Sequence, residues 1–233
     1  MPSSSFGHVD TWIFDLDNTL YPADCNLFRE IDERMTLFIE KTLDMDAVSA
    51  RTMQKQFYAD YGTTLSGLMH EHGIAPQDFM SFVHDIDLSP VDRNEALASA
   101  IAALPGKRYI FTNGSVKHAE NVAGKIGILE LFDDVFDIEK AGFVPKPHQG
   151  AYDLCWQAWN IDPKRAAMFE DMPQNLEVPH AAGMETVLVQ SQAEWCEDEP
   201  EGKRPSRPGE RFDHVNHVTS DLTQFLSLIT RRV

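Results

Sequence analysis

Residues 11–19 read TWIFDLDNT, a short and mainly apolar segment that leads directly into an acidic turn. This composition predicts a buried strand over 11–14 that ends at Asp15, followed by a loop. Asp15 and Asp17 would then stand just beyond the carboxyl end of a strand, where open α/β sheets place their active sites. The stretch also fits a simple Asx turn, because Asp and Asn commonly terminate strands.

Beyond Pro90 the chain alternates between helical and strand patterns. Alternation of this kind predicts a parallel sheet, here with at least five strands. The fold class expected is therefore α/β, with a Rossmann-like parallel sheet as its core. We expect helices over 95–104, 116–126, 152–159, 175–182 and 222–229, and further strands over 108–113, 134–138, 166–170 and 186–189.

Residues 21–90 carry apolar side chains at helical spacing only, beginning with Leu27, Ile31 and Met35. The first strand must pair with strands that come after this block, so the block is an insertion. We expect a core of residues 1–20 and 91–233, with residues 21–90 inserted after the first strand as a helical domain. Residues 194–211 are rich in Pro, Gly and charge, and are expected to form a mobile loop.

The charge of the chain excludes some classes of partner. There are 20 Lys and Arg residues against 37 Asp and Glu residues, a formal net charge of −17. A field of this sign repels phosphate backbones and anionic lipids, so neither nucleic acid nor a membrane surface is expected as a partner. A small anionic substrate would be repelled as well, unless positive charge is concentrated at one place.

The cysteines and the first residues bear on the expected compartment. Cys25, Cys155 and Cys196 are odd in number and widely spaced, which favours neither a disulfide framework nor a zinc site. The first residues contain neither the basic nor the apolar segment of a signal peptide. We therefore expect a reducing, cytoplasmic location.

Two further motifs follow predicted strands. Thr112, Asn113 and Gly114 lie between the apolar part of a strand and a helix, where hydroxyl and backbone N–H groups could cradle an anion. An ordinary strand–turn–helix connection capped by Ser115 is an equal alternative. Lys146 stands between two prolines, which hold the local backbone extended.

Glu170 and Asp171 end the predicted strand 166–170. Two adjacent acids repel one another unless a cation or a basic neighbour is present. Together with Asp15 and Asp17, they would form an oxygen-rich site suited to Mg²⁺. One carboxylate could attack phosphorus while another transfers a proton.

DLDNT, TNG, the lysine of PKP, and ED with a following Asn occur in this order, and the chain therefore resembles the haloacid dehalogenase superfamily of phosphatases. The resemblance implies that Asp15 is the nucleophile that becomes phosphorylated and that Asp17 is the general acid and base. It implies that Thr112 and Lys146 hold the phosphoryl oxygens. Mg²⁺ would be held by Asp15, Asp171 and the main-chain carbonyl of Asp17, with Glu170 as a direct or water-mediated ligand. Members that cleave carbon–halogen bonds lack an acid at the position of Asp17.

The amino-acid sequence of the insertion is similar to the pyrimidine 5′-nucleotidase group of that superfamily. The similarity is carried by LYPADCNLFREIDERM and FVHDIDLS, among others, and also by FTNGSVKHAENV. This similarity implies a helical cap over the site and pyrimidine nucleoside monophosphates, UMP or CMP foremost, as substrates. Asn113, Gly114, Lys117 and His118 are the expected substrate contacts outside the catalytic set.

Three alternatives remain open from the sequence. The chain could be a phosphatase for a sugar phosphate or phosphoglycolate, or a phosphomutase of the same superfamily. It could also be a binding or regulatory module that holds a phosphate ester without turnover. Its small-molecule partner would be a phosphate ester in each case, and the chain itself is expected to be a monomer or homodimer.

Overall fold

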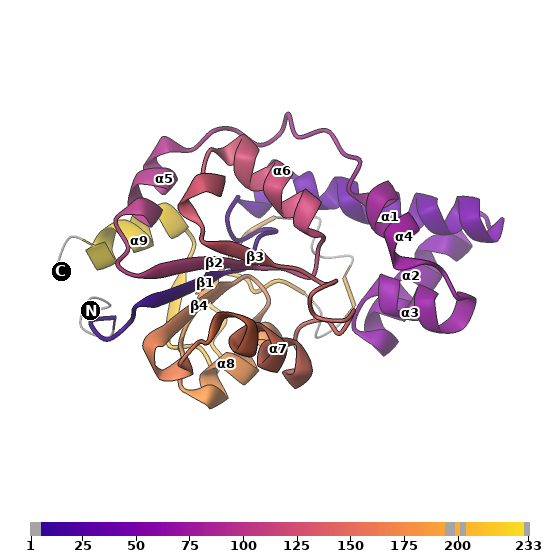
Figure 1. Cartoon of the computed structure of the whole chain (residues 1–233). Helices are drawn as coiled ribbons and strands as arrows, with labels where there is room; N and C mark the ends of the chain where they lie inside the picture. Colours follow the sequence, from indigo (N-terminus) through magenta and orange to yellow (C-terminus); the bar gives the residue numbers. More distant parts are fainter. Residues whose placement is uncertain (1–5, 194–198, 201–203, 231–233) are drawn as a thin grey trace. The chain divides into compact units, whose positions relative to one another are not determined.

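A computed structural model describes residues 6–193, 199–200 and 204–230 (Figure 1). The chain divides into two compact units. The sheet unit comprises Met1–Cys25, Val91–Gln192 and Pro205–Val233, and the helical unit comprises Asn26–Pro90 and Ala193–Arg204. The first break thus falls at residue 25 rather than 20. Much of the expected mobile loop 194–211, at 194–198 and 201–203, lies outside the described residues, as do residues 1–5 at the amino terminus.

The sheet unit is built on a parallel sheet of six strands in the order β3-β2-β1-β4-β5-β6. The expected α/β fold with a parallel core is confirmed. The central strand β1 pairs with β2 on one side and β4 on the other, so that Phe14 lies beside both Ile110 and Phe169. The strands are β1 Thr11–Phe14, β2 Lys107–Phe111, β3 Asp134–Phe136, β4 Ala166–Glu170, β5 Glu185–Val189 and β6 His217–Thr219.

Three strands differ from the sequence prediction. β2 ends at Phe111 instead of 113, because the Thr112 hydroxyl accepts a hydrogen bond from the Gly114 N–H and starts a turn. β3 ends at Phe136, because the side chain of Asp137 accepts from the N–H groups of Val116 and Lys140. β6 has the sequence HVT, with Val218 as its one apolar residue, so the sequence pattern does not predict it, and all three of its residues are half-buried.

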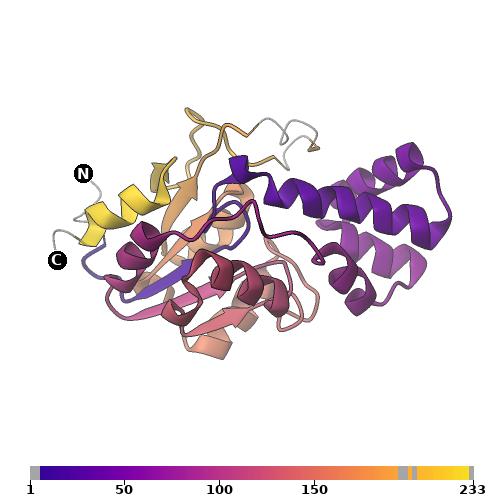
Figure 2. The same ribbon diagram turned by 90° about the horizontal axis from the view of Figure 1, so that it is seen from above.

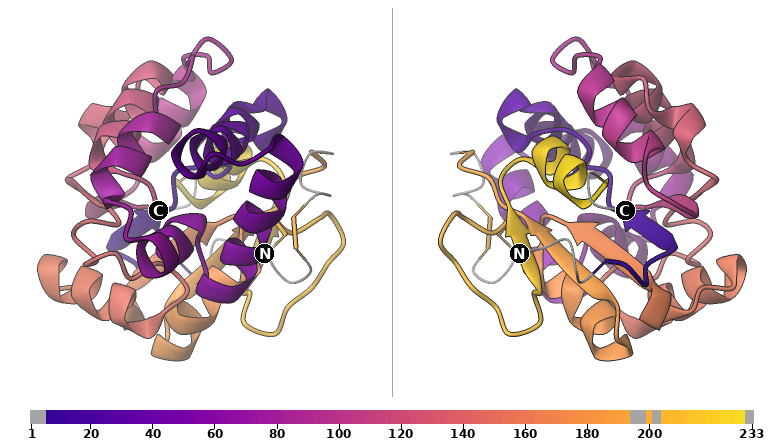
Figure 3. Two further views of the ribbon diagram at one scale, coloured as in Figure 1. Left: turned by 90° about the vertical axis from the view of Figure 1, so that its right-hand side faces the viewer. Right: turned by 90° about the vertical axis from the view of Figure 1, so that its left-hand side faces the viewer.

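Helices cover both faces of this sheet (Figures 1 and 3). One face carries α5, α6 and α9, and the other carries α7 and α8. Because both faces are covered, the central strands read as continuous apolar runs rather than as alternating ones. The helices are α5 Glu95–Ala102, α6 Val116–Ile126, α7 Gln149–Trp159, α8 Glu177–Ala182 and α9 Leu222–Thr230. Short 3₁₀ turns lie at Ala23–Cys25, Leu129–Leu131, Pro163–Arg165 and Pro173–Leu176.

Packing on the two faces of β1 fixes the strand that carries the acidic turn. Phe14 stacks on Phe169 with ring centroids 4.5 Å apart. On the other face Ile13 belongs to an apolar cluster with Met168 and Tyr152. Each such buried side chain contributes about 1.5–3 kcal/mol. A register shift would expose these residues, so the position of Asp15 at the end of β1 is firmly set.

The helical unit contains α1 Leu27–Leu43, α2 Ala47–Tyr61, α3 Thr64–His72 and α4 Pro76–Val83 (Figure 2). Asp46 caps α2 by accepting from the N–H groups of Val48 and Ser49, and Thr63 caps α3. Along the described residues, no helix combines the length and the apolar character needed to span a membrane.

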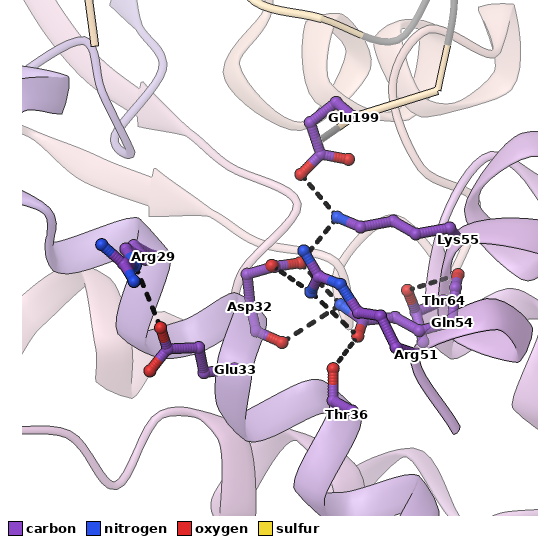
Figure 4. A network of polar contacts seen from close by, with 9 residues as sticks. All are labelled: Arg29, Asp32, Glu33, Thr36, Arg51, Gln54, Lys55, Thr64 and Glu199. Carbon is purple, nitrogen blue, oxygen red and sulfur yellow. Dashed lines mark hydrogen bonds and ion pairs between the residues drawn. The ribbon is translucent and has the colours of Figure 1, made fainter. Parts of the chain in front are cut away.

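A polar network joins α1 to α2 around Asp32, which is 6% exposed (Figure 4). Its carboxylate accepts from Arg51, from Gln54 Nε2 at 2.6 Å and from Lys55 Nζ at 2.9 Å. Lys55 Nζ also lies 2.8 Å from Oε1 of Glu199, which places residue 199 against α2. This charged cluster links the first half of α1 to α2 by polar contacts.

Candidate active site

The carboxyl ends of β1, β2 and β4 bring the predicted motifs together. Asp15 follows β1, Thr112 follows β2, and Glu170 ends β4 with Asp171 next to it. The backbone N–H of Asp15 donates to the carbonyl of Phe169 at 2.9 Å, so Asp15 lies directly beside Glu170. In the observed strand order, β1 and β4 flank the point where the chain reverses direction across the sheet. Doubly wound sheets bind ligands at this switch point.

Lys146 reaches the same point from the connection between β3 and α7. Its Nζ donates to Oδ1 of Asp15 at 2.7 Å, to Oε1 of Glu170 at 2.6 Å and to the carbonyl of Phe111 at 2.9 Å. The residue is only 2% exposed. All three ammonium protons thus have an acceptor, which explains how a lysine can be buried here.

Asn113 holds the backbone of this lysine. Its Oδ1 accepts from the Lys146 N–H at 2.8 Å, and its Nδ2 donates to the Lys146 carbonyl at 3.2 Å. The loop after β2 and the loop after β3 are therefore locked together by one side chain. Asn113, expected as a substrate contact, is engaged in positioning Lys146 in this structure.

The Glu170 carboxylate is surrounded by donors. Oε1 accepts from Lys146 and from Asn175 Nδ2 at 2.7 Å, and Oε2 accepts from the Met172 N–H at 3.0 Å. The Tyr152 hydroxyl in turn donates to the Asn175 carbonyl at 2.7 Å. With both oxygens bound to protein donors, Glu170 is suited to orienting Lys146 and reaching a metal through water.

The donor set fits a hard divalent cation. Carboxylate oxygens of Asp15, Glu170 and Asp171, all buried, lie within 4.8 Å of one another. Three carboxylates face one ammonium group, so negative charge remains in excess. The Asn18 side chain donates from Nδ2 to Oδ2 of Asp171 at 3.3 Å, while Asn18 Oδ1 is buried with no hydrogen-bond partner. Oxygen donors of this kind are those that Mg²⁺ prefers. The Asp17 side chain is not one of this group of three.

Burial and mutual repulsion set the proton affinities of these acids. Burial, with the charges of Glu170 and Asp17 added, raises the pKa of Asp15 to about 8, although Lys146 acts against this shift. Burial, followed by the charges of Glu170 and Asp15, raises the pKa of Asp171 well above its ordinary value. Burial lowers the pKa of Lys146, but the charges of Asp15 and Glu170 outweigh it and raise the value overall. A bound divalent cation would favour the ionised carboxylates.

Asp17 is held by two side chains that the sequence does not mark as its partners. The Tyr21 hydroxyl donates to Oδ1 of Asp17 at 2.6 Å, and Nε2 of His118 lies 2.8 Å from the same oxygen. Burial, followed by the charge of Asp17, raises the pKa of Tyr21 well above its ordinary value, so the hydroxyl keeps its proton. His118, expected as a substrate contact, bonds to the candidate acid and base in this structure.

The remaining expected substrate contacts have different surroundings. Gly114 is buried in the turn after β2, and its N–H is occupied by the Thr112 hydroxyl at 2.9 Å. Because that hydroxyl accepts this bond, its own proton stays available for an anion. Lys117 is exposed on α6, and no hydrogen bond or ion pair within the described residues links it to the acidic group. The one signal that could have pointed to Tyr21 is its spacing of four residues from Asp17.

Comparison with known families agrees with this geometry. The chain belongs to the haloacid dehalogenase-like hydrolases, since that family matches residues 9–183. The match runs from the start of β1 past β4 and includes every strand-end motif described above. The chain is therefore a hydrolase by family, and the superfamily expected from the sequence is confirmed.

Two curated relatives carry names that concern phosphate. "Enolase-phosphatase E1" of Frankia alni is 33% identical over 128 residues, 54% of this chain and 50% of the relative. "Phosphate metabolism protein 8" of Saccharomyces cerevisiae is 25% identical over 134 residues, 53% of this chain and 42% of the relative. The matched part thus spans about half the length of either relative.

Solved structures of the superfamily share the fold along nearly the whole chain. L-2-haloacid dehalogenase from Xanthobacter autotrophicus has a TM-score of 0.59 at 14% identity, with 97% of this chain and 100% of that chain covered. The HAD hydrolase YfnB from Bacillus subtilis, bound to magnesium, has a TM-score of 0.58 at 16% identity, covering 95% and 98%. At such identities the likeness concerns the fold alone.

Proposed function

We propose that this protein hydrolyses phosphomonoesters through a phosphoaspartate formed on Asp15. The observation that carries the proposal is the pair of carboxylates two residues apart, one bonded to Lys146 at 2.7 Å and the other held by Tyr21 and His118. A nucleophile and a separate acid are what an ester with a poor leaving group requires. Carbon–halogen cleavage needs no such acid, so Asp17 favours phosphoryl chemistry.

Each side chain would have a defined task in this reaction. Asp15 attacks phosphorus, and Asp17 protonates the ester oxygen as it leaves. Asp17 then takes a proton from water, which attacks the phosphoaspartate and frees Asp15. Lys146 and the Thr112 hydroxyl bind the phosphoryl oxygens, whose charge increases in the transition state.

Mg²⁺ is the proposed cofactor. The residues that would hold it are Asp15, Asp171 and the main-chain carbonyl of Asp17, with Glu170 acting through water. When bound, the cation would neutralise charge on the carboxylates and on the transferring phosphoryl group. Support comes from the buried group of three carboxylates and from the magnesium found in the fold neighbour YfnB. A bound cation would also explain how a chain of net charge −17 can accept an anionic substrate.

For the substrate we propose pyrimidine nucleoside 5′-monophosphates, UMP and CMP foremost. The support is the amino-acid sequence of the insertion and of the segment FTNGSVKHAENV, both of which resemble that nucleotidase group. The helical unit would act as the cap that gives specificity. The relatives named above are a phosphatase and a protein of phosphate metabolism, which supports the reaction type but names no nucleotide. A cytoplasmic monomer or homodimer is proposed from the sequence alone.

A substrate panel tests the proposal. Phosphate release would be measured with Mg²⁺ for UMP, CMP, AMP, GMP, phosphoglycolate and glucose 6-phosphate, using the wild type and Asp15→Asn. We expect UMP or CMP to give the highest kcat/KM and Asp15→Asn to release no phosphate while remaining folded by circular dichroism. Turnover retained in Asp15→Asn would refute the mechanism. A preference for phosphoglycolate or a sugar phosphate would refute only the substrate, and ligand binding without phosphate release would favour a regulatory module.

A further inference from the structure

The acidic turn after β1 holds Asn18 in an uncommon backbone conformation. Its φ angle is 61°, in the left-handed region that Asn and Gly tolerate better than most residues. The turn is closed by the N–H groups of Thr19 and Leu20, which donate to the carbonyl of Leu16 at 3.3 and 3.0 Å. Glycine would adopt this conformation without strain. What asparagine adds at this position is therefore its side chain.

The Asn18 side chain contacts a carboxylate of the candidate metal site. Its Nδ2 donates to Oδ2 of Asp171 at 3.3 Å, across 153 positions of the chain. Asn18 is 6% exposed and Asp171 is 5% exposed, so the contact is shielded from bulk water. The main chain of Asp171 is held as well, because its carbonyl accepts from the Ser206 N–H at 3.3 Å. The main freedom left to Asp171 is rotation of its side chain, which the Asn18 amide restrains.

The three carboxylates of the site have different kinds of partner. Asp15 and Glu170 bond to the same ammonium group, that of Lys146, at 2.7 and 2.6 Å. The Asp171 carboxylate bonds to the neutral amide of Asn18. A neutral donor fixes the orientation of a carboxylate without cancelling its charge. The negative charge of Asp171 therefore remains for a cation, while its direction is set by the protein.

The orientation of a carboxylate bears on which divalent cation it binds. Ca²⁺ takes about six to eight oxygens in a flexible arrangement and binds carboxylates through one oxygen or both. Mg²⁺ requires a nearly ideal octahedron. Chelation by both oxygens of one carboxylate distorts that octahedron, because the two oxygens lie too close together. A carboxylate that turns freely therefore suits Ca²⁺, and one held to present a single oxygen suits Mg²⁺.

We propose that Asn18 is a positioning residue that holds Asp171 to a single-oxygen contact with the cation and thereby favours Mg²⁺ over Ca²⁺. The hydrogen bond to Oδ2 fixes the plane of the carboxylate, and turning both oxygens toward one ion would strain that bond. The inference rests on the proposed function, because it concerns the cation assigned to the phosphatase site. It assigns the choice of metal to a residue that is not itself a ligand.

Metal binding measures this role without a catalytic assay. The full chain, freed of metal with EDTA and then dialysed, would be titrated separately with Mg²⁺ and Ca²⁺ by calorimetry. Asn18→Gly retains the left-handed backbone and removes the amide. We expect this variant to bind Mg²⁺ about tenfold more weakly, as when a metal ligand loses its hydrogen-bond partner. Its affinity for Ca²⁺ should change by less than about twofold, since Ca²⁺ tolerates a mobile carboxylate.

Three further variants make the comparison specific. Asn18→Asp also tolerates the left-handed conformation but replaces the donor by an acceptor, so its preference for Mg²⁺ should fall as well. This variant decides the question alone if Asn18→Gly does not fold. Asn160→Gly is the matched control, because Asn160 has a φ angle of 51° at the end of α7 and should leave both affinities unchanged. Asp171→Asn removes the ligand and so measures cations bound at surface acids.

The outcomes separate the role of Asn18 from the proposed function. Equal weakening of both cations in the Asn18 variants, or unchanged Mg²⁺ binding, would overturn the role in metal choice and leave the phosphatase proposal intact. A wild type that binds no more Mg²⁺ than Asp171→Asn would overturn the proposed cofactor, and the role of Asn18 with it. Metal binding as expected, together with no phosphate release from any ester, would refute the hydrolysis alone.

Discussion

Nζ of Lys146 lies 2.7 Å from Oδ1 of Asp15, although the two residues are 131 positions apart in the chain. The same Nζ is 2.6 Å from Oε1 of Glu170, so one buried ammonium group separates two buried carboxylates. The side chains of Lys146 and Glu170 are each 1% exposed and that of Asp15 is 10% exposed. Folding of the sheet unit and the chemistry of the site therefore depend on the same ion pairs.

Lys146→Met should destabilise the protein as well as inactivate it. It leaves the carboxylates of Asp15 and Glu170 buried against one another, which costs about 3–5 kcal/mol when a buried pair loses one partner. Urea unfolding would measure this loss. Lys107→Met is the matched control, since the Lys107 side chain is 63% exposed and pairs with Asp133 at the surface. A surface pair is worth about 1 kcal/mol or less. Equal losses in the two variants would contradict the account of the buried pair.

Removal of divalent cations should abolish phosphate release, and Mg²⁺ should restore it. The cation should also stabilise the folded protein by about 2.7 kcal/mol at a concentration one hundred times its dissociation constant. Thermal unfolding with EDTA or Mg²⁺ reads out binding independently of activity. The shift should vanish in Asp171→Asn and persist in Asp133→Asn, whose carboxylate pairs with Lys107 away from the site. An Mg²⁺ effect that Asp171→Asn leaves unchanged would place the cation elsewhere.

Asn113→Ala should reduce kcat more than it reduces stability. The variant loses both hydrogen bonds to the Lys146 backbone, which are worth about 0.5–1.5 kcal/mol each. Its larger effect would come from a displaced ammonium group at Asp15. Asn94→Ala is the control, because Asn94 caps α5 through the Leu97 N–H. Loss of that cap costs about 1 kcal/mol. If both variants lose activity alike, Asn113 has no special role in placing Lys146.

Asp32→Ala should destabilise the helical unit. Asp32 accepts from three side chains of α2, and its removal takes the carboxylate partner from Arg51 and Lys55, although Lys55 keeps Glu199 and Gln54 keeps the main-chain carbonyl of residue 32. The expected loss is about 3 kcal/mol, as for other broken buried pairs. Hydrogen exchange should rise in α1 and α2 and stay unchanged in the sheet. Glu33→Ala tests the specificity of this effect, because its pair with Arg29 is exposed and should matter little.

Cys155 should resist alkylation in the native protein. The residue is fully buried, and burial raises the pKa of its thiol above the ordinary value. A raised thiol pKa keeps the group protonated at pH 8, and the protonated form is a poor nucleophile. Mass mapping after iodoacetamide treatment should find Cys155 modified only after unfolding. Modification of native Cys155 faster than of the half-buried Cys25 would show that α7 opens readily.

Much of the fold could be predicted from residue patterns. The apolar run at 11–14 and the alternation after Pro90 indicate a parallel α/β sheet, because strands buried on both faces must be continuously apolar. The strand-end motifs likewise indicate which residues gather at one edge. β6 escaped prediction since an edge strand needs no apolar run, and the break at residue 25 carries no compositional signal.

The residue types in the motifs already determined which acids, lysine and hydroxyl carry the proposed chemistry, because charge and donor capacity belong to the side chains themselves. The hydrogen-bond partners of these side chains were decided only by the tertiary structure. Asn113 bonds to Lys146 and His118 bonds to Asp17, contacts that the motifs do not indicate, and Tyr21 joins His118 on the same oxygen. Hydrogen bonds act over about 3 Å. Such proximity between distant segments depends on strand order and register, which no local pattern contains.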